Sequence, residues 1–204
     1  MTTHGPRLKD LLHEVVIHEP GVFDAEPGDN NLSPDLVFPE FNEVDIDKLA
    51  GLHAPHVLLD VDGTLVPQGD LDRDVEGATI EKIQQIRNDG RFATVSLATE
   101  NGSRHEKLLH RLGMPADTAV FQPWKDDEDR LSAPLWKTSE DYWYGILSEL
   151  NCSNNPNEVV VIGNSLRRDI ALPRQLGMRT VLVGTLELVL RPKEAILADM
   201  RARS

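Results

Sequence analysis

The stretch Leu58-Leu59-Asp60-Val61-Asp62-Gly63-Thr64-Leu65-Val66-Pro67 holds two aspartates two positions apart, between an apolar run and a glycine. On an extended strand, residues i and i+2 point to the same face, so both carboxylates leave the strand end together. Ligands of open α/β sheets bind outside the carboxyl ends of the strands. One carboxylate can attack an electrophile while the other transfers a proton. The stretch therefore predicts a strand that ends in a catalytic pair.

An Asp-x-Asp-Gly segment also occurs in surface turns and in calcium loops. An EF-hand loop needs further Asp or Asn ligands before the glycine and a Glu near its end. The flanking residues 57–59 and 64–66 are instead apolar residues and one threonine. This context favours a buried strand and turn over a calcium loop.

Strands and helices alternate along most of the chain. We expect strands at 57–61, 92–98, 119–121, 159–162 and 180–183, with helices at 75–88, 104–112, 139–150, 169–176 and 186–200. Upstream we expect a helix at 8–17, a loop at 18–40 and a short helix at 45–52, and a further loop at 122–136. Such alternation predicts an α/β fold, a three-layer Rossmann-like parallel sheet with helices on both faces.

Charge divides the chain into two parts. The net charge of the 204 residues is −13, and residues 1–52 hold 3 Lys or Arg against 11 Asp or Glu. We therefore expect an acidic N-terminal extension, partly loop, over 1–52 and a catalytic domain over 53–204. The acidic balance argues against nucleic acid as a partner.

The composition also bears on compartment. Cys152 is the single cysteine, which excludes an intrachain disulfide and fits a reducing environment. The N-terminus lacks a secretory signal pattern, and no apolar run approaches the ~20 residues of a transmembrane segment. We expect a cytoplasmic protein.

Three further motifs stand at predicted strand or helix ends. Thr99 closes the run 94–98 and is followed by Glu100, while Lys137 directly precedes the helix at 139–150, which Thr138 or Ser139 can cap. The segment Gly163-Asn164-Ser165-Leu166-Arg167-Arg168-Asp169 follows the apolar run 159–162. Because the carboxyl ends of parallel strands meet at one edge, these residues are expected to converge.

In order, spacing and context, the four motifs resemble the haloacid dehalogenase superfamily of phosphohydrolases over residues 55–185. The resemblance implies a Mg²⁺-dependent phosphatase that hydrolyses a phosphomonoester through an aspartyl-phosphate on Asp60. Asp62 would protonate the leaving oxygen and then deprotonate the attacking water. Superfamily members that cleave carbon–halogen bonds usually lack this second acid, so its presence favours phosphate chemistry.

The resemblance also implies which residues bind the phosphoryl group. Gly63 would let the backbone approach it, and Thr99 and Glu100 would line it. Lys137 would neutralise its charge. In the family a proline often follows this lysine, whereas Thr138 does here, which leaves Lys125 as an alternative.

Asp60, Asp62, Asn164 and Asp169 are the metal residues that the resemblance implies. The common form of the last motif begins Gly-Asp, and Asn164 replaces that aspartate here. A carboxamide oxygen still suits Mg²⁺, but the exchange removes one negative charge and should weaken metal binding. Asp169 would act through metal-bound water or orient other groups.

The spacing predicts a member without a cap domain. Only 36 residues separate Asp62 from Thr99, and 37 separate Thr99 from Lys137. Within the capless branch, residues 44–49 and 64–67 resemble the YqeG-type phosphatases, some of which act on phosphatidylglycerophosphate. The open site would admit a small phosphorylated substrate, a phospholipid or a macromolecular phosphate, and a homo-oligomer is an open alternative. Two other hypotheses remain, a catalytically weak scaffold of the same fold and a phosphotransferase to an acceptor other than water.

Overall fold

The computed structural model describes residues 33–67, 74–99, 105–122 and 137–184. In this part of the chain a six-stranded parallel sheet has the order β1-β6-β5-β2-β3-β4. The strands are β1 Leu36–Phe38, β2 His56–Asp60, β3 Thr94–Ala98, β4 Val120–Phe121, β5 Val159–Gly163 and β6 Arg179–Val183. The α-helices are α2 Ile46–Ala50, α3 Gly77–Asn88, α4 His105–Arg111, α5 Glu140–Glu149 and α6 Leu172–Gln175. The predicted α/β parallel sheet is confirmed.

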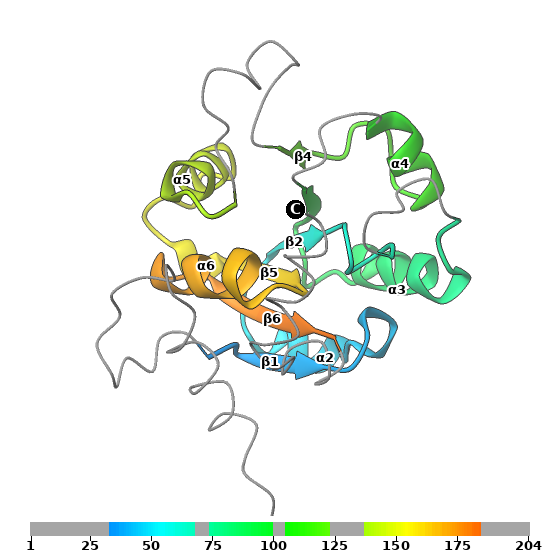
Figure 1. Ribbon diagram of the computed structural model, residues 1–204, viewed down its shortest axis with the longest axis horizontal. Helices are drawn as coiled ribbons and strands as arrows, with labels where there is room; N and C mark the ends of the chain where they lie inside the picture. The colour runs from blue at the N-terminus through cyan, green and yellow to red at the C-terminus, as the bar shows by residue number, and fades with distance from the viewer. Residues whose placement is uncertain (1–32, 68–73, 100–104, 123–136, 185–204) are drawn as a thin grey trace, which may run out of the picture.

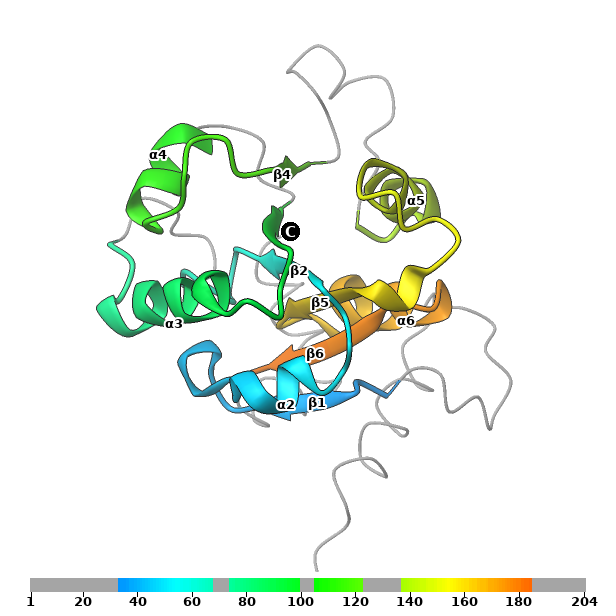
Figure 2. The same ribbon diagram turned by 180° about the vertical axis from the view of Figure 1, so that it is seen from behind.

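Side-chain alternation along β2 divides the core into two layers. Val57 and Leu59 face a cluster that includes residues of α2, α3 and α4. Leu58 points to the other face, where it packs with residues of α5 and α6. From one side α6 lies in front of the sheet, and from the opposite side α2 does (Figures 1 and 2). The helices therefore cover both faces of the sheet.

The order of the strands creates a switch point beside β2. The chain runs from β2 to β3 and β4 on one side, then crosses to β5 and β6 on the other. Asp60 is the last residue of β2, and Gly163 is the last residue of β5. A crevice opens at such a point outside the carboxyl ends of the strands, and it is where ligands of open α/β sheets bind. The predicted motif residues follow these two strand ends.

The predicted loop at 18–40 is wrong for residues 36–38, which form β1. This strand pairs in parallel with β6, Leu36 opposite Val181. Phe38 and Phe41 are buried in the core that α2 and α3 share. Residues 33–52 of the acidic extension thus belong to the same sheet and core. The helices predicted at 8–17 and 186–200, and all but residue 122 of the loop predicted at 122–136, lie outside the described residues.

The helix predicted at 169–176 begins earlier and has two parts. A π-helical turn spans Leu166–Ala171 and leads into α6. Single π-turns often occur at functional sites. Within the described ranges, no helix has the length and apolar character that a membrane crossing requires.

Candidate active site

The ammonium group of Lys137 joins two carboxylates at the switch point. Its Nζ atom donates hydrogen bonds to Oδ1 of Asp60 and, at 2.9 Å, to Oδ1 of Asp169. Lys137 and Asp169 are each 1% exposed and Asp60 is 6% exposed. Lysine is rarely buried unless it is paired. The structure therefore brings together three residues that lie 77 and 32 positions apart in the chain.

Aromatic residues of α5 hold the backbone beside Lys137. The indole Nε1 of Trp143 donates to the carbonyl oxygen of Lys137 at 2.7 Å, and the hydroxyl of Tyr142 donates to the carbonyl of Phe121 at 3.1 Å. The two rings meet edge to face, with centroids 5.1 Å apart. Ser139 is the N-cap of α5 as expected, but its side chain makes no capping bond. The indole hydrogen bond thus fixes the backbone of Lys137.

Hydrogen bonds at the start of the π-helical turn position Asp169. The backbone N–H of Ser165 donates to Oδ2 of Asp169 at 3.0 Å, and the hydroxyl of Ser165 accepts from the N–H of Arg168 at 3.3 Å. A Cβ atom on Gly163 would overlap the Asp169 carboxyl group. Both oxygens of Asp169 are engaged, which suits a residue that orients other groups.

A tight turn presents Asp60 and Asp62. The hydroxyl of Thr64 donates to Oδ2 of Asp60 at 2.8 Å. Gly63 has φ +86°, a conformation that glycine adopts readily, and its N–H donates to the Val66 carbonyl at 2.7 Å. Asp62 forms an isolated bridge with Val66. This turn reverses the chain directly after the end of β2.

The Asn164 side chain lies against this turn. A Cβ atom added to Gly63 would overlap the Asn164 amide group. Oδ1 of Asn164 is buried and has no hydrogen-bond partner among the described residues. Buried polar atoms are normally satisfied, so an unpaired one requires an explanation. A role of this amide oxygen as a ligand for a cation is one such explanation.

The buried charges change each other's titration. Burial, together with the Asp169 carboxylate, raises the pKa of Asp60 to about 6, although Lys137 and Thr64 oppose the shift. Burial alone would lower the pKa of Lys137, but the charges of Asp169 and Asp60 outweigh it and raise that pKa. Lys137 is therefore a permanent cation at neutral pH.

The donor set fits Mg²⁺, whose preferred ligands are hard oxygens. The carboxylates of Asp60 and Asp169 share the ammonium of Lys137, and Asp62 adds a third carboxylate two positions after Asp60, which leaves negative charge for a cation to neutralise. The unpaired amide oxygen of Asn164 supplies a further oxygen at the same strand edge. The residues present therefore fit the ion.

Thr99 is the one remaining predicted phosphate-binding residue within the described ranges. Thr99 directly follows β3 and is buried, and its N–H donates to the Phe121 carbonyl at 3.0 Å. It lies at the same edge of the sheet as Asp60, because β2 and β3 pair with Asp60 opposite Ala98. Glu100 and the alternative lysine, Lys125, lie outside the described residues.

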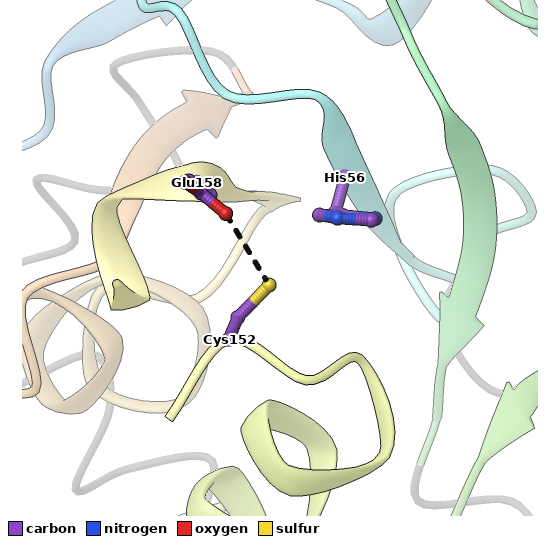
Figure 3. A group of neighbouring side chains, drawn as sticks. All are labelled: His56, Cys152 and Glu158. Atoms are coloured by element: carbon purple, nitrogen blue, oxygen red, sulfur yellow. Dashed lines mark hydrogen bonds between the residues drawn. The ribbon is translucent and has the colours of Figure 1, made fainter. Parts of the chain in front are cut away.

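Sequence reasoning missed a second cluster. One ligand atom from each of His56, Cys152 and Glu158 lies within 4.8 Å of the other two (Figure 3). His56 and Cys152 lie 96 positions apart and form no local motif, so only the pairing of β2 with β5 could have revealed the cluster.

Comparisons with known proteins leave the family open. No family model matches the chain, and no curated protein matches it. An uncharacterized protein from Listeria monocytogenes serotype 4b is similar in structure, with 17% identity and a TM-score of 0.46 over 72% of this chain and 98% of that one. A hypothetical protein from Xanthomonas campestris has 19% identity and a TM-score of 0.39 over 72% of this chain and 74% of its own. At these TM-scores neither likeness assigns a family or an activity.

Proposed function

We propose that the protein is a Mg²⁺-dependent phosphatase of haloacid dehalogenase type that hydrolyses a phosphomonoester. The observation that carries the proposal is the buried meeting of Asp60, Lys137 and Asp169 at the switch point between β2 and β5. A buried ion pair is a weak source of stability, since desolvation opposes it. Perturbed titratable groups at a ligand-binding edge are instead typical of functional sites.

The chemistry follows from the roles of two carboxylates. An oxygen of Asp60 attacks phosphorus, the bond from phosphorus to the leaving oxygen breaks, and Asp62 gives that oxygen its proton. Water then attacks the acyl-phosphate, Asp62 takes a proton from the water, and the bond between phosphorus and Asp60 breaks to release inorganic phosphate. A carboxylate has about four lone-pair sites, so the bonds from Lys137 and Thr64 leave Asp60 able to react.

Charge neutralisation explains the surrounding residues. In this proposal Lys137 offsets the charge of the transferred group, and the hydroxyl of Thr99 donates to a phosphoryl oxygen. Mg²⁺, when bound, would be held by Asp60, the Asp62 backbone carbonyl and Asn164, and would stabilise the developing negative charge. Asp169 holds Lys137 in place. The proposed substrate classes are small phosphorylated metabolites, phospholipids and macromolecular phosphates. The proposed location of the enzyme is the cytoplasm.

A phosphatase screen tests the proposal. Metal-replete protein is assayed on aryl phosphate, sugar phosphates, nucleotides, lipid phosphates and phosphopeptides, beside Asp60→Asn and the control Asp47→Asn, whose carboxylate is exposed on α2. We expect phosphate release by wild type and by the control only. Transfer to added alcohols would instead identify a phosphotransferase. A wild type that neither turns over phosphate esters nor binds Mg²⁺ would contradict the proposal and favour a scaffold.

A further inference from the structure

A second group of residues with metal-ligating side chains lies at the opposite end of the strands from Asp60. His56 is the first residue of β2, and Glu158 directly precedes β5. The two strands pair with His56 opposite Val159. Cys152 comes from the turn that follows α5. Since His56 begins β2 and Asp60 ends it, about 13 Å of strand separates the two sites.

The three side chains converge on one point. In Figure 3 the Cys152 sulfur points into the space between Glu158 and His56. The thiol contacts Oε2 of Glu158 at 4.0 Å, and one ligand atom from each of the three residues lies within 4.8 Å of the other two. Ligands around a tetrahedral zinc ion lie about 3.3–3.8 Å apart, so closure requires side-chain movements of about 1 Å.

Neighbouring residues hold all three in place. Cys152 and Glu158 are both tied to Asn155, whose N–H donates to the Cys152 carbonyl at 2.9 Å and whose carbonyl accepts from the Glu158 N–H at 3.0 Å. Nδ1 of His56 lies 3.0 Å from the hydroxyl oxygen of Thr94, at the start of β3. A metal-bound histidine usually donates its other ring N–H to an oxygen acceptor, which fixes the tautomer and the ring, and the Thr94 hydroxyl oxygen is such an acceptor.

We infer that His56, Cys152 and Glu158 form a second cation site, which binds Zn²⁺ through sulfur, nitrogen and oxygen with a solvent molecule in the fourth position. Thiolate and imidazole select a borderline-soft ion such as Zn²⁺, whereas Mg²⁺ prefers an oxygen-only site. The bound ion links the starts of β2 and β5 to the turn after α5. It acts apart from the proposed phosphatase site, so neither inference depends on the other.

Binding of Co²⁺ and Zn²⁺ to the full chain tests the site. We expect one Co²⁺ per chain to produce a thiolate-to-cobalt charge-transfer band, which Zn²⁺ removes and Mg²⁺ does not. Cys152→Ser should abolish the band, and His56→Gln and Glu158→Gln should weaken Zn²⁺ affinity by at least about tenfold. Thr94→Val, which removes only the group that positions His56, should weaken it by about tenfold.

Matched variants separate this site from the other. His53→Gln makes the same exchange at an exposed histidine three positions away, and Asp60→Asn changes the other strand edge; both should keep the band and the affinity. Circular dichroism confirms folding, and the half-exposed Glu158 gives a variant that tests the site even where Cys152→Ser fails to fold. Absence of the band in wild type, or equal Zn²⁺ affinity in Glu158→Gln and His53→Gln, would overturn the inference.

Discussion

Nζ of Lys137 lies 2.9 Å from Oδ1 of Asp169, and both residues are withdrawn from solvent. Lys137→Met keeps the length of the side chain but leaves Asp60 and Asp169 facing each other without a counter-charge. Removing one partner of a buried pair costs about 3–5 kcal/mol. We expect that loss in the free energy of unfolding from urea titration, together with loss of phosphatase activity. Lys107→Met, at an exposed position of α4, is the control and should change neither. A Lys137→Met protein as stable as wild type would show that the pair has no energetic role.

The contact between Gly63 and Asn164 predicts a glycine-specific effect. Gly63→Ala places a methyl group at φ +86° and against the Asn164 amide. Strain of this kind costs about 1–3 kcal/mol, and displacement of Asn164 should also weaken Mg²⁺ binding. Gly145→Ala is the matched control, because nothing lies within 4 Å of the added Cβ on α5, and it should stabilise the protein by about 0.5–1 kcal/mol. Calorimetry of unfolding and of Mg²⁺ binding measures both effects. Unchanged Mg²⁺ affinity in Gly63→Ala would mean that Asn164 does not touch the ion.

The unpaired oxygen of Asn164 predicts opposite effects of two substitutions. Asn164→Asp introduces a carboxylate and should tighten Mg²⁺ binding by about tenfold or more, since the charge of the ligands sets affinity for hard cations. Asn164→Ala removes the oxygen and should weaken it. Titration calorimetry of both variants gives the two dissociation constants. Equal Mg²⁺ affinities of the two variants would exclude Asn164 as a ligand and would leave its buried, unpaired oxygen without an explanation.

Titration of Asp60 predicts how metal binding depends on pH. Its pKa is raised to about 6, first by burial and then by Asp169, so the free carboxyl group carries a proton below pH 6. Mg²⁺ must displace that proton, and its affinity should therefore fall about tenfold per pH unit below about 6 and level off above it. Calorimetry in two buffers of different ionisation enthalpy should detect about half a proton released per ion at pH 6 and almost none at pH 8. No proton release at pH 6 would contradict a role for Asp60 in binding the ion.

The candidate site was predictable because strand ends share an edge. Asp60, Thr99 and Asn164 each lie at or just beyond the end of a predicted strand, and parallel pairing brings such ends together. The burial of Lys137 was harder to predict from the sequence, since lysine is usually exposed. It depends on the indole of Trp143, which bonds the Lys137 carbonyl. The pairing of Asn164 with Gly63 comes from neighbouring strands about 100 positions apart, which spacing alone does not reveal.

Two features could not be obtained from local patterns. β1 has only three residues, between Pro34 and Pro39, and composition of this kind favours a loop. Its pairing with β6, far along the chain, overrides that local preference. The cluster of His56, Cys152 and Glu158 likewise depends on which strands are neighbours. Both features are tertiary, and neither leaves a periodic signal in the sequence.

The attachment of β1 gives a last prediction, on Asp35. Its carboxylate accepts hydrogen bonds from the Thr180 N–H at 2.9 Å and from Nη1 of Arg174 at 2.6 Å. Asp35→Ala leaves these donors unpaired, so β1 should detach, and the free energy of unfolding should fall by about 1.5–3 kcal/mol, the range for hydrogen bonds to charged groups.

Asp47→Ala is the matched control for this substitution. It removes a surface ion pair with Arg91 in which Asp47 is largely exposed, and such pairs contribute little. Urea unfolding followed by tryptophan fluorescence compares the two variants, and hydrogen exchange of residues 36–38 reports the strand directly. Equal stability of the two variants, with unchanged protection of β1, would contradict the role of Asp35. A single cooperative unfolding transition, with its midpoint at a lower urea concentration in Asp35→Ala than in wild type, would have a different meaning. The acidic segment from residue 33 onward would then fold together with the sheet that carries Asp60.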